Sequence, residues 1–176
     1  KYDAVRRCPD RGFDCDRMAK ERLKHFVSKE ALNIEGLGKK IIENFWSLNL
    51  IKYPQDIFRL DYKKIENLEG WGKLSSNNLK YSIDQARKIS LNKFIFSLGI
   101  RHIGQENAKL ISNTLKTADN FFKLANNFKD DALSNIDGIG QVKINSIKEF
   151  FLEKENKKIL TELKKLLEIG DTIEEE

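Results

Sequence analysis

Apolar residues recur along this chain at the three- and four-residue spacing that places them on one face of a helix. Two clear examples are the run Ile144, Ile147, Phe150 and Phe151 and the run Leu79, Ile83 and Ala86. The same spacing predicts a helix over residues 16–29 and another over 155–168, with Gly170 as the residue that ends the second. No stretch alternates between apolar and polar residues as a half-buried strand does, so the pattern predicts an all-α fold.

The glycines are grouped rather than scattered. Eight of the ten fall within four short windows, at residues 34–38, 68–72, 99–104 and 136–140. The windows share the pattern apolar-x-Gly-apolar-Gly, except that the third has His102 in place of the first glycine of the pattern. The last glycines of successive windows are 34, 32 and 36 residues apart. This near-constant period predicts four copies of one structural unit.

Each window is followed by the same apolar pattern. Small or apolar residues stand four and seven positions after the last glycine: Ile42 and Phe45, Ser76 and Leu79, Ala108 and Ile111, Ile144 and Ile147. A residue type that commonly caps helices precedes three of the windows, at Asp61, at Ser90 and at either Asp130 or Asp131. Each unit is therefore predicted to be a helix, a tight connection, and a second helix that starts at the last glycine.

This order of elements resembles the helix-hairpin-helix motif. The hairpin needs backbone angles that glycine adopts at low cost, and the second helix turns its free N–H groups and the positive end of its dipole outward. A phosphate oxygen fits that position, and such a contact carries no direct sequence information. The candidate DNA-binding residues are Gly36, Gly38, Lys39, Lys40, Gly70, Gly72, Lys73, Arg101, Gly104, Gly138, Gly140 and Lys143.

Not every copy need bind DNA. One or two copies are expected to serve only as connections between helices or as protein contacts, and the third is the first candidate because His102 replaces its glycine. In the second copy Trp71 stands between the two glycines. We expect its ring to pack against a neighbouring element rather than to stack on a base.

The charge of the chain suits a polyanionic partner. The whole chain holds 32 basic and 27 acidic side chains. Because the last six residues hold four acids and no base, the first 170 residues hold 32 basic and 23 acidic side chains, a net charge of +9. A lysine-rich surface that contacts only water is the alternative. No apolar run approaches the roughly 18 residues of a membrane span, and two cysteines do not crosslink a secreted fold of this size, so we expect a cytoplasmic, nucleoid-associated protein without a membrane partner.

Three segments resemble bacterial NAD-dependent DNA ligases. Residues 24–38, which begin Lys24-His25-Phe26-Val27-Ser28, are similar to the family's segment between its zinc finger and its helix-hairpin-helix domain. Residues 98–104 and 136–140 are similar to its third and fourth hairpins. The similarity runs from about Cys8 to Gly170, in the family's order and spacing.

The resemblance implies a multidomain parent enzyme that uses NAD and magnesium to seal nicks in duplex DNA during replication and repair. The catalytic lysine of that family lies in a Lys-x-Asp-Gly motif, and this chain contains no such tetrapeptide. The chain is therefore expected to be non-catalytic and monomeric, and to hold nicked double-stranded DNA beside the other domains of the ligase. The domains expected are a zinc-finger remnant over 1–16, a connecting helix over 17–30, the DNA-binding domain with four repeats over 31–170, and an acidic tail or linker over 171–176.

The same resemblance assigns Cys8 and Cys15 to the second half of a four-cysteine zinc site. Zinc needs four ligands, and only these two cysteines are present, so zinc is expected in the parent protein and not in this chain. His25 could supply a third ligand, but it matches the family's His-Phe-Val-Ser stretch rather than a ligand position. The alternative is a pair of cysteines without a metal.

Two other functions compete with the ligase interpretation. One is a helix-hairpin-helix tail of another DNA repair protein, which usually carries two hairpins rather than four. The other is a helical scaffold that binds proteins and not DNA. The net charge of the body disfavours the scaffold, and binding measurements separate the two.

Overall fold

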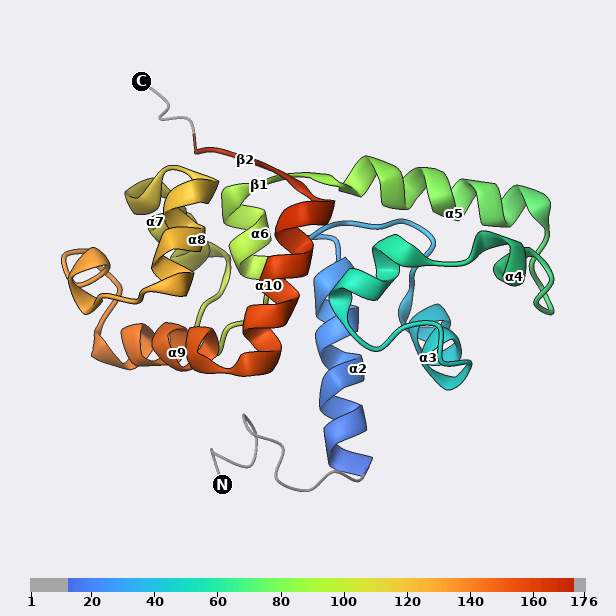
Figure 1. Cartoon of the computed structure of the whole chain (residues 1–176), viewed down its shortest axis with the longest axis horizontal. Coiled ribbons are helices and arrows are strands. Elements are labelled where there is room, and N and C mark those ends of the chain that lie inside the picture. Colours follow the sequence, from blue (N-terminus) through green and yellow to red (C-terminus); the bar gives the residue numbers. More distant parts are fainter. Residues whose placement is uncertain (1–12, 173–176) are drawn as a thin grey trace.

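Eleven helical segments and two short strands make up the part of the chain that the computed structural model describes, residues 13–172, with side chains from residue 15 onward (Figure 1). In chain order they are α2 (Phe13–Val27), α3 (Lys39–Ser47), η1 (Pro54–Arg59), α4 (Tyr62–Glu66), α5 (Lys73–Ala86), β1 (Lys88–Ser90), α6 (Leu91–Ser97), α7 (Gln105–Leu115), α8 (Ala118–Asn126), η2 (Asp130–Ala132), α9 (Gln141–Leu152), α10 (Lys154–Leu166) and β2 (Glu168–Gly170). The prediction of an all-α fold is confirmed, and the helices expected over 16–29 and 155–168 correspond to α2 and α10.

The repeat pattern predicts the core correctly. The residues four positions after the last glycines, Ile42, Ser76, Ala108 and Ile144, are at most 2% exposed. Those seven positions after, Phe45, Leu79, Ile111 and Ile147, are equally buried. Each second helix therefore turns the same face inward, which burial of apolar surface stabilises.

Helix α2 lies in the middle of the molecule, between the elements α3 to α5 on one side and α6 to α9 on the other (Figure 1). Leu23 and Phe26 are fully buried there. The ring of His25 lies 2.6 Å from the carbonyl oxygen of Phe96 in α6 through its Nε2. The helix that the sequence suggested as a connection is thus a central packing element.

Three details expected from the sequence were wrong: the absence of strands, Gly170 as the end of the last helix, and Asp130 or Asp131 as a helix cap. Residues 88–90 and 168–170 form a two-stranded parallel pair in which Ile89 lies opposite Ile169, and three residues are too few to show a period-two pattern. Gly170 lies in that strand, and α10 ends earlier, at Leu166. Asp61 and Ser90 are the N-cap residues of α4 and α6 as expected, but Asp130 and Asp131 lie inside η2.

Arg87 joins three elements that are far apart in the sequence. It follows α5, and its guanidinium donates hydrogen bonds to the carbonyl oxygens of Phe58 (3.1 Å) and Leu166 (3.2 Å). The same group lies 5.2 Å from the centre of the Phe58 ring, and Asp84 accepts from its Nε at 3.3 Å. One side chain therefore joins η1, α5 and the end of α10.

The start of the segment predicted as an acidic tail is bonded to the body. The carboxylate of Asp171 accepts from the backbone N–H of Ala118, the first residue of α8, at 2.9 Å. The N–H of Thr172 donates to the carbonyl oxygen of Lys116 at 2.7 Å. The domain boundaries themselves stay a prediction.

Candidate nucleic-acid interface

Four hairpins with the same backbone lie before α3, α5, α7 and α9. We call them hairpin 1 (residues 34–38), hairpin 2 (68–72), hairpin 3 (100–104) and hairpin 4 (136–140). The last glycine of each is the N-cap residue of the helix that follows. Its carbonyl oxygen accepts the first helical hydrogen bond, at 2.9–3.1 Å, so the next three amides have no helical acceptor. None of these glycines has a side chain that could accept from the free amides, and at α5 the Ser75 hydroxyl accepts from the N–H of Gly72 itself at 2.9 Å.

The two glycines of a hairpin are explained by different things. The first has a positive φ, +91° at Gly36 and +92° at Gly138, where a side chain is strained. The last has an ordinary extended φ, and a Cβ at Gly38 or Gly140 would meet no heavy atom of the described chain within 4 Å. The expectation that the hairpin needs glycine angles is therefore right for the first position only. Nothing in the described fold requires glycine at the last position, whereas a partner that approaches the backbone closely would require it.

Hairpin 3 keeps the shared backbone without its glycine. His102 has a φ of +69°, which costs free energy for any residue with a Cβ. Asn107, one turn into α7, donates to the His102 carbonyl oxygen at 3.1 Å and so supports that conformation. Arg101 is half-buried and already takes part in an interaction within the chain.

The lysines beside the hairpins fall into two groups. Lys39 and Lys40 at the start of α3 and Lys73 at the start of α5 are exposed. Lys143 in α9 is half-buried, and its Nζ donates to the carbonyl oxygen of Gly138 at 2.9 Å and to Asn107 Oδ1 at 3.4 Å. Lys143 therefore joins hairpin 4 to α7, the helix after hairpin 3, although the sequence placed it with the others as a phosphate contact.

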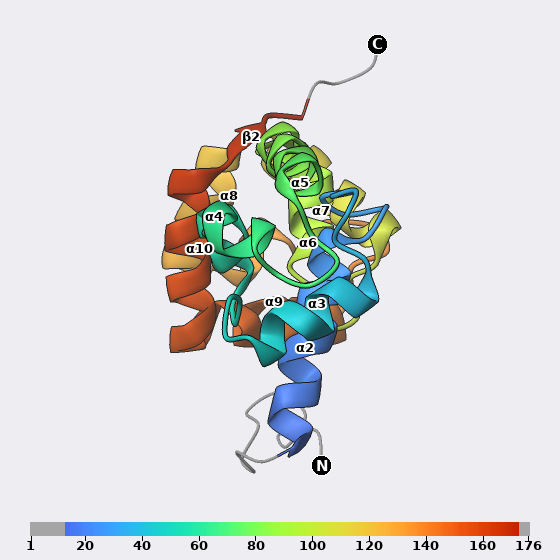
Figure 2. The same ribbon diagram turned by 90° about the vertical axis from the view of Figure 1, so that its right-hand side faces the viewer.

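The hairpins are arranged as two pairs. Gly36 of hairpin 1 faces Leu79 of α5, with 3.5 Å between the position of a Cβ and the Leu79 Cδ1. Gly138 of hairpin 4 faces Leu110 of α7 in the same way, at 3.3 Å. We call residues 31–86 the first hairpin pair and residues 91–152 the second hairpin pair. In Figure 2 the helices α3, α4 and α5 of the first hairpin pair face the viewer.

A groove of about 630 Å³ runs between hairpins 1 and 2. Gly36, Gly70, Trp71 and Tyr81 are among its lining residues. The Trp71 ring is half-buried and lies 5.6 Å from the ring of Phe45, centre to centre. The expectation that Trp71 packs against a neighbouring element is confirmed.

An ion-pair network holds hairpin 1 to the central helix. Glu43 of α3 accepts hydrogen bonds from Lys24 at 2.8 Å and from Lys20 at 3.1 Å, both on α2. These two bonds, that from Lys24 first, hold the pKa of the Glu43 carboxyl below its usual value. The start of α3, with its exposed lysines, is thereby fixed relative to the core.

Two exposed apolar residues beside the hairpins were not predicted from the sequence. Leu74 and Val142 are each the second residue of a helix that follows a hairpin, and their side chains are 75% and 67% exposed. The signal was present in the sequence, because an apolar residue two positions after the last glycine falls outside the buried pattern.

The zinc half-site is only partly described. Cys8 lies outside the described residues, and Cys15 is half-buried near the start of α2. His25 contacts Phe96 as given above, which accounts for it without a metal. Among residues 13–172, no group of three or more His, Cys, Asp or Glu side chains could hold a metal ion. The described helices include none that is long and apolar enough to cross a membrane.

Comparison with known protein families places part of the chain directly. The helix-hairpin-helix motif matches residues 93–160, which span hairpins 3 and 4 and the helices around them. This helix-hairpin-helix region includes hairpin 3, so the replacement of glycine by His102 is compatible with the motif.

The chain is also similar to bacterial proteins named DNA ligase. It is 62% identical over 173 residues to the one from Pelagibacter ubique, covering 98% of this chain and 26% of the relative. It is 44% identical over 176 residues to the one from Parvibaculum lavamentivorans, covering 93% of this chain and 25% of the relative. The relative from Rickettsia bellii is 41% identical over 181 residues, covering 96% of this chain and 26% of the relative. The chain thus spans about a quarter of the length of the relatives it matches, and the resemblance to bacterial DNA ligases is confirmed.

Proposed function

We propose that this chain is the non-catalytic DNA-binding domain of a larger NAD-dependent DNA ligase and holds the sugar-phosphate backbone of nicked duplex DNA. The residues proposed to contact DNA are Gly36, Gly38, Lys39, Lys40, Gly70, Gly72, Lys73, Arg101, Gly104, Gly138, Gly140 and Lys143. The partners proposed are nicked duplex DNA and the other domains of the same ligase.

The last glycines of the hairpins carry this proposal. A Cβ there would clash with nothing in the described chain, yet glycine occupies the position four times. Each of these glycines precedes three helix amides that have no helical acceptor. A phosphate group that approaches closely would use both features, because amides at a helix start bind anions and a Cβ would hold the anion away.

The charge around these amides is complementary to DNA in the first hairpin pair. Lys39, Lys40 and Lys73 are exposed and lie within the first turn of their helices. Contacts of this kind go to the phosphate backbone and fix the position of the protein on the duplex without reading base sequence. The chain would therefore hold DNA in place around a nick of any sequence.

The chemistry of sealing belongs to the proposed parent enzyme. In the family that the chain resembles, NAD supplies the adenylyl group and magnesium assists its transfer. Because no Lys-x-Asp-Gly tetrapeptide occurs in the chain, none of its residues fits the role of the adenylated lysine. Zinc in the parent, held by Cys8, Cys15 and a further cysteine pair, is part of the same proposal.

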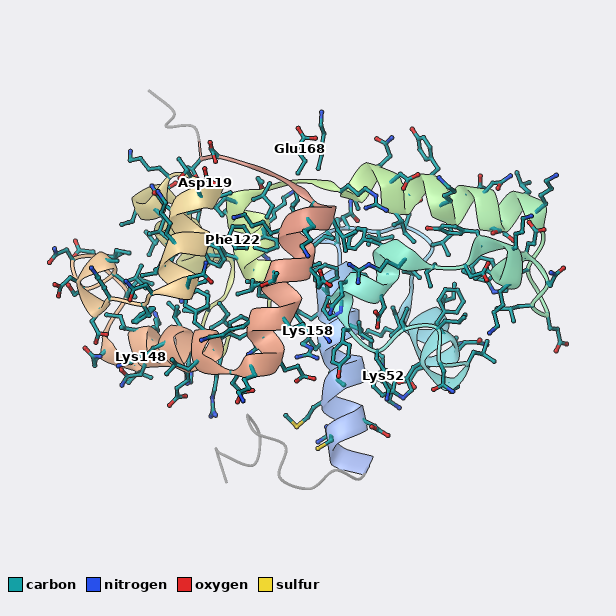
Figure 3. All side chains as sticks on the ribbon, viewed as in Figure 1. Lys52, Asp119, Phe122, Lys148, Lys158 and Glu168 are labelled. Atoms are coloured by element: carbon teal, nitrogen blue, oxygen red, sulfur yellow. The ribbon has the colours of Figure 1, made fainter. Side chains whose placement is uncertain are left out.

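The proposal is tested by titrating a labelled duplex with the chain at salt concentrations from about 50 to 300 mM. If four to six phosphates are neutralised, log K falls with log salt with a slope of about −4 to −5, and two unrelated duplex sequences bind equally. As a matched control, Lys148→Gln and Lys158→Gln remove exposed charges from α9 and α10, away from the hairpins (Figure 3), and should change the slope less than Lys39→Gln and Lys73→Gln. A flat salt response, or a strong preference for one sequence, would contradict backbone binding.

The absence of catalysis has its own test. Incubation of the chain with labelled NAD and magnesium is expected to leave the protein unlabelled, and nicked duplex is expected to stay unsealed. A stable protein–AMP adduct would show that the assignment as a non-catalytic domain is wrong.

A further inference from the structure

Leu74 and Val142 occupy the same place in two different hairpins. Each is the second residue of its helix, two positions after the last glycine, and the two side chains are 75% and 67% exposed. The corresponding residues after hairpins 1 and 3 are Lys40 and Glu106, which are also exposed. The position therefore faces solvent in all four hairpins and is apolar only in hairpins 2 and 4.

The recurrence is what sets these two residues apart from ordinary surface leucines. Single exposed apolar residues are normal on protein surfaces. Leu152 at the end of α9 is such a case, since it is 59% exposed and lies three turns away from the hairpin. Leu74 and Val142 instead stand at one structurally matched position, beside a glycine that leaves the backbone open.

The partner that covers them follows from the chemistry of the neighbouring groups. The open amides of α5 and α9 and the exposed Lys73 suit phosphate oxygens. In a nucleic acid the group next to each phosphate is a sugar ring, the apolar part of the backbone. A side chain at the second helix position lies within one turn of the amides, beside the sugar that adjoins the bound phosphate.

We propose that Leu74 and Val142 pack against deoxyribose rings adjacent to the phosphates held by hairpins 2 and 4, and that this contact favours DNA over RNA. The inference rests on the proposed function and deepens it. Selectivity arises because a ribose carries a 2′-hydroxyl, and burying that hydroxyl against an apolar side chain leaves it without a hydrogen-bond partner.

The contact has a signature that separates it from the lysine contacts. Neutralising a phosphate releases counterions, so loss of a lysine reduces the salt slope. Burial of apolar surface releases none, so loss of Leu74 or Val142 weakens binding equally at every salt concentration. The two kinds of contact can therefore be measured in one series of titrations.

The experiment compares the unaltered chain with the double variant Leu74→Asn, Val142→Thr, which keeps the size of both side chains and makes them polar. Each protein is titrated with a DNA duplex and with a DNA–RNA hybrid of the same sequence, at three salt concentrations. We expect the double variant to bind the DNA duplex about five- to twentyfold more weakly with an unchanged salt slope, as expected for two partly buried apolar side chains. We also expect its preference for DNA over the hybrid to fall at least threefold.

Two controls keep the result specific. Leu152→Asn makes the same chemical change at an exposed site outside the hairpins and should leave both affinities unchanged. The double variant Leu74→Ala, Val142→Ala shortens the apolar side chains, and alanine favours the helix, so this variant should stay folded. It should therefore weaken DNA binding even if the polar variant has a lowered melting temperature.

The outcomes distinguish the inference from the proposed function. The inference alone is overturned if the unaltered chain binds the DNA duplex with a steep salt slope and both double variants bind it equally well. The double variants would then also have the same preference for DNA over the hybrid as the unaltered chain. Weaker binding accompanied by a reduced salt slope also overturns it. Unaltered chain that binds no duplex at any salt concentration overturns both.

Discussion

The first and second hairpin pairs share a backbone but differ in how their side chains are used. In the first hairpin pair, the helix starts carry the exposed lysines Lys39, Lys40 and Lys73, and a groove of about 630 Å³ separates the two hairpins. In the second hairpin pair, Lys143 donates to Gly138 and Asn107 and so joins hairpin 4 to α7. The same repeated backbone therefore supports an open, cationic surface in one place and an internally bonded connection in another. If the chain binds DNA as proposed, we expect the first hairpin pair to supply most of the electrostatic attraction.

The largest effect is expected at Arg87, which joins η1 and α5 of the first hairpin pair to the end of α10. Arg87→Met removes the donors to Phe58 and Leu166, and we expect it to lower the free energy of unfolding by about 2–3 kcal/mol, since two carbonyl oxygens lose a charged partner. Urea unfolding would measure this loss of free energy, and the dependence of the free energy on urea concentration should be the same as for the unaltered chain. At a temperature where the variant is folded, duplex binding should also weaken, because η1 and α5 lose a link to α10, which packs against α9 of the second hairpin pair. Normal binding by a destabilised variant would show that the pairs act independently.

A carboxylate placed at the last glycine tests which pair holds phosphate. We expect Gly38→Asp to weaken duplex binding by about 1–3 kcal/mol, the size of losing charge-assisted contacts and adding repulsion. Gly140→Asp should weaken it within the same range but less than Gly38→Asp. Both variants should melt normally, because the backbone there is extended and a Cβ meets nothing within 4 Å in the described chain. If both variants melt normally and bind the duplex as tightly as the unaltered chain, these hairpins only connect helices.

The two kinds of lysine can be exchanged for glutamine to test the comparison directly. Lys39→Gln is expected to reduce the salt slope by about 0.9 and leave the melting temperature unchanged, as for the loss of one phosphate contact. Lys143→Gln is expected to lower the free energy of unfolding by about 1 kcal/mol, through its lost bonds to Gly138 and Asn107, and to change the slope less. Titration and thermal melting of both proteins measure these quantities. If Lys143→Gln instead reduces the salt slope and leaves the free energy of unfolding unchanged, Lys143 leaves its internal partners to bind DNA.

The smallest effect is expected at hairpin 3. His102→Gly removes the strain of a residue with a Cβ at a φ of +69°, which should raise the free energy of unfolding by about 0.5–1 kcal/mol. The entropy that glycine adds to the unfolded chain offsets part of this gain. His102→Ala should change duplex binding by less than about 0.5 kcal/mol, because the second hairpin pair contributes less to binding. Melting and titration of both variants decide the matter. A large loss of affinity in His102→Ala would make hairpin 3 a DNA contact equal to the others.

The local features of this protein could be predicted from its amino-acid sequence. Four copies of the glycine pattern, the inward face of each second helix and the irregular third copy were all readable from spacing, because helix periodicity and the backbone of a tight hairpin depend on residues a few positions apart. Burial of Ile42, Ser76, Ala108 and Ile144 confirms that part. The assignment of individual DNA contacts stays a prediction.

Which side chains of different repeats contact each other could not be predicted, because it depends on how the helices pack. Lys143 donates a hydrogen bond to Asn107, 36 residues away in the sequence, and Arg87 donates one to Leu166, 79 residues away. Nothing in the local pattern distinguishes Lys143 from Lys39, since both follow a glycine within one turn. The difference arises because Asn107 of α7 is brought beside α9 by packing, whereas the exposed start of α3 is held to α2 through Glu43, further along the helix. Neighbours of this kind are set by how helices pack in three dimensions, which the repeat pattern leaves open.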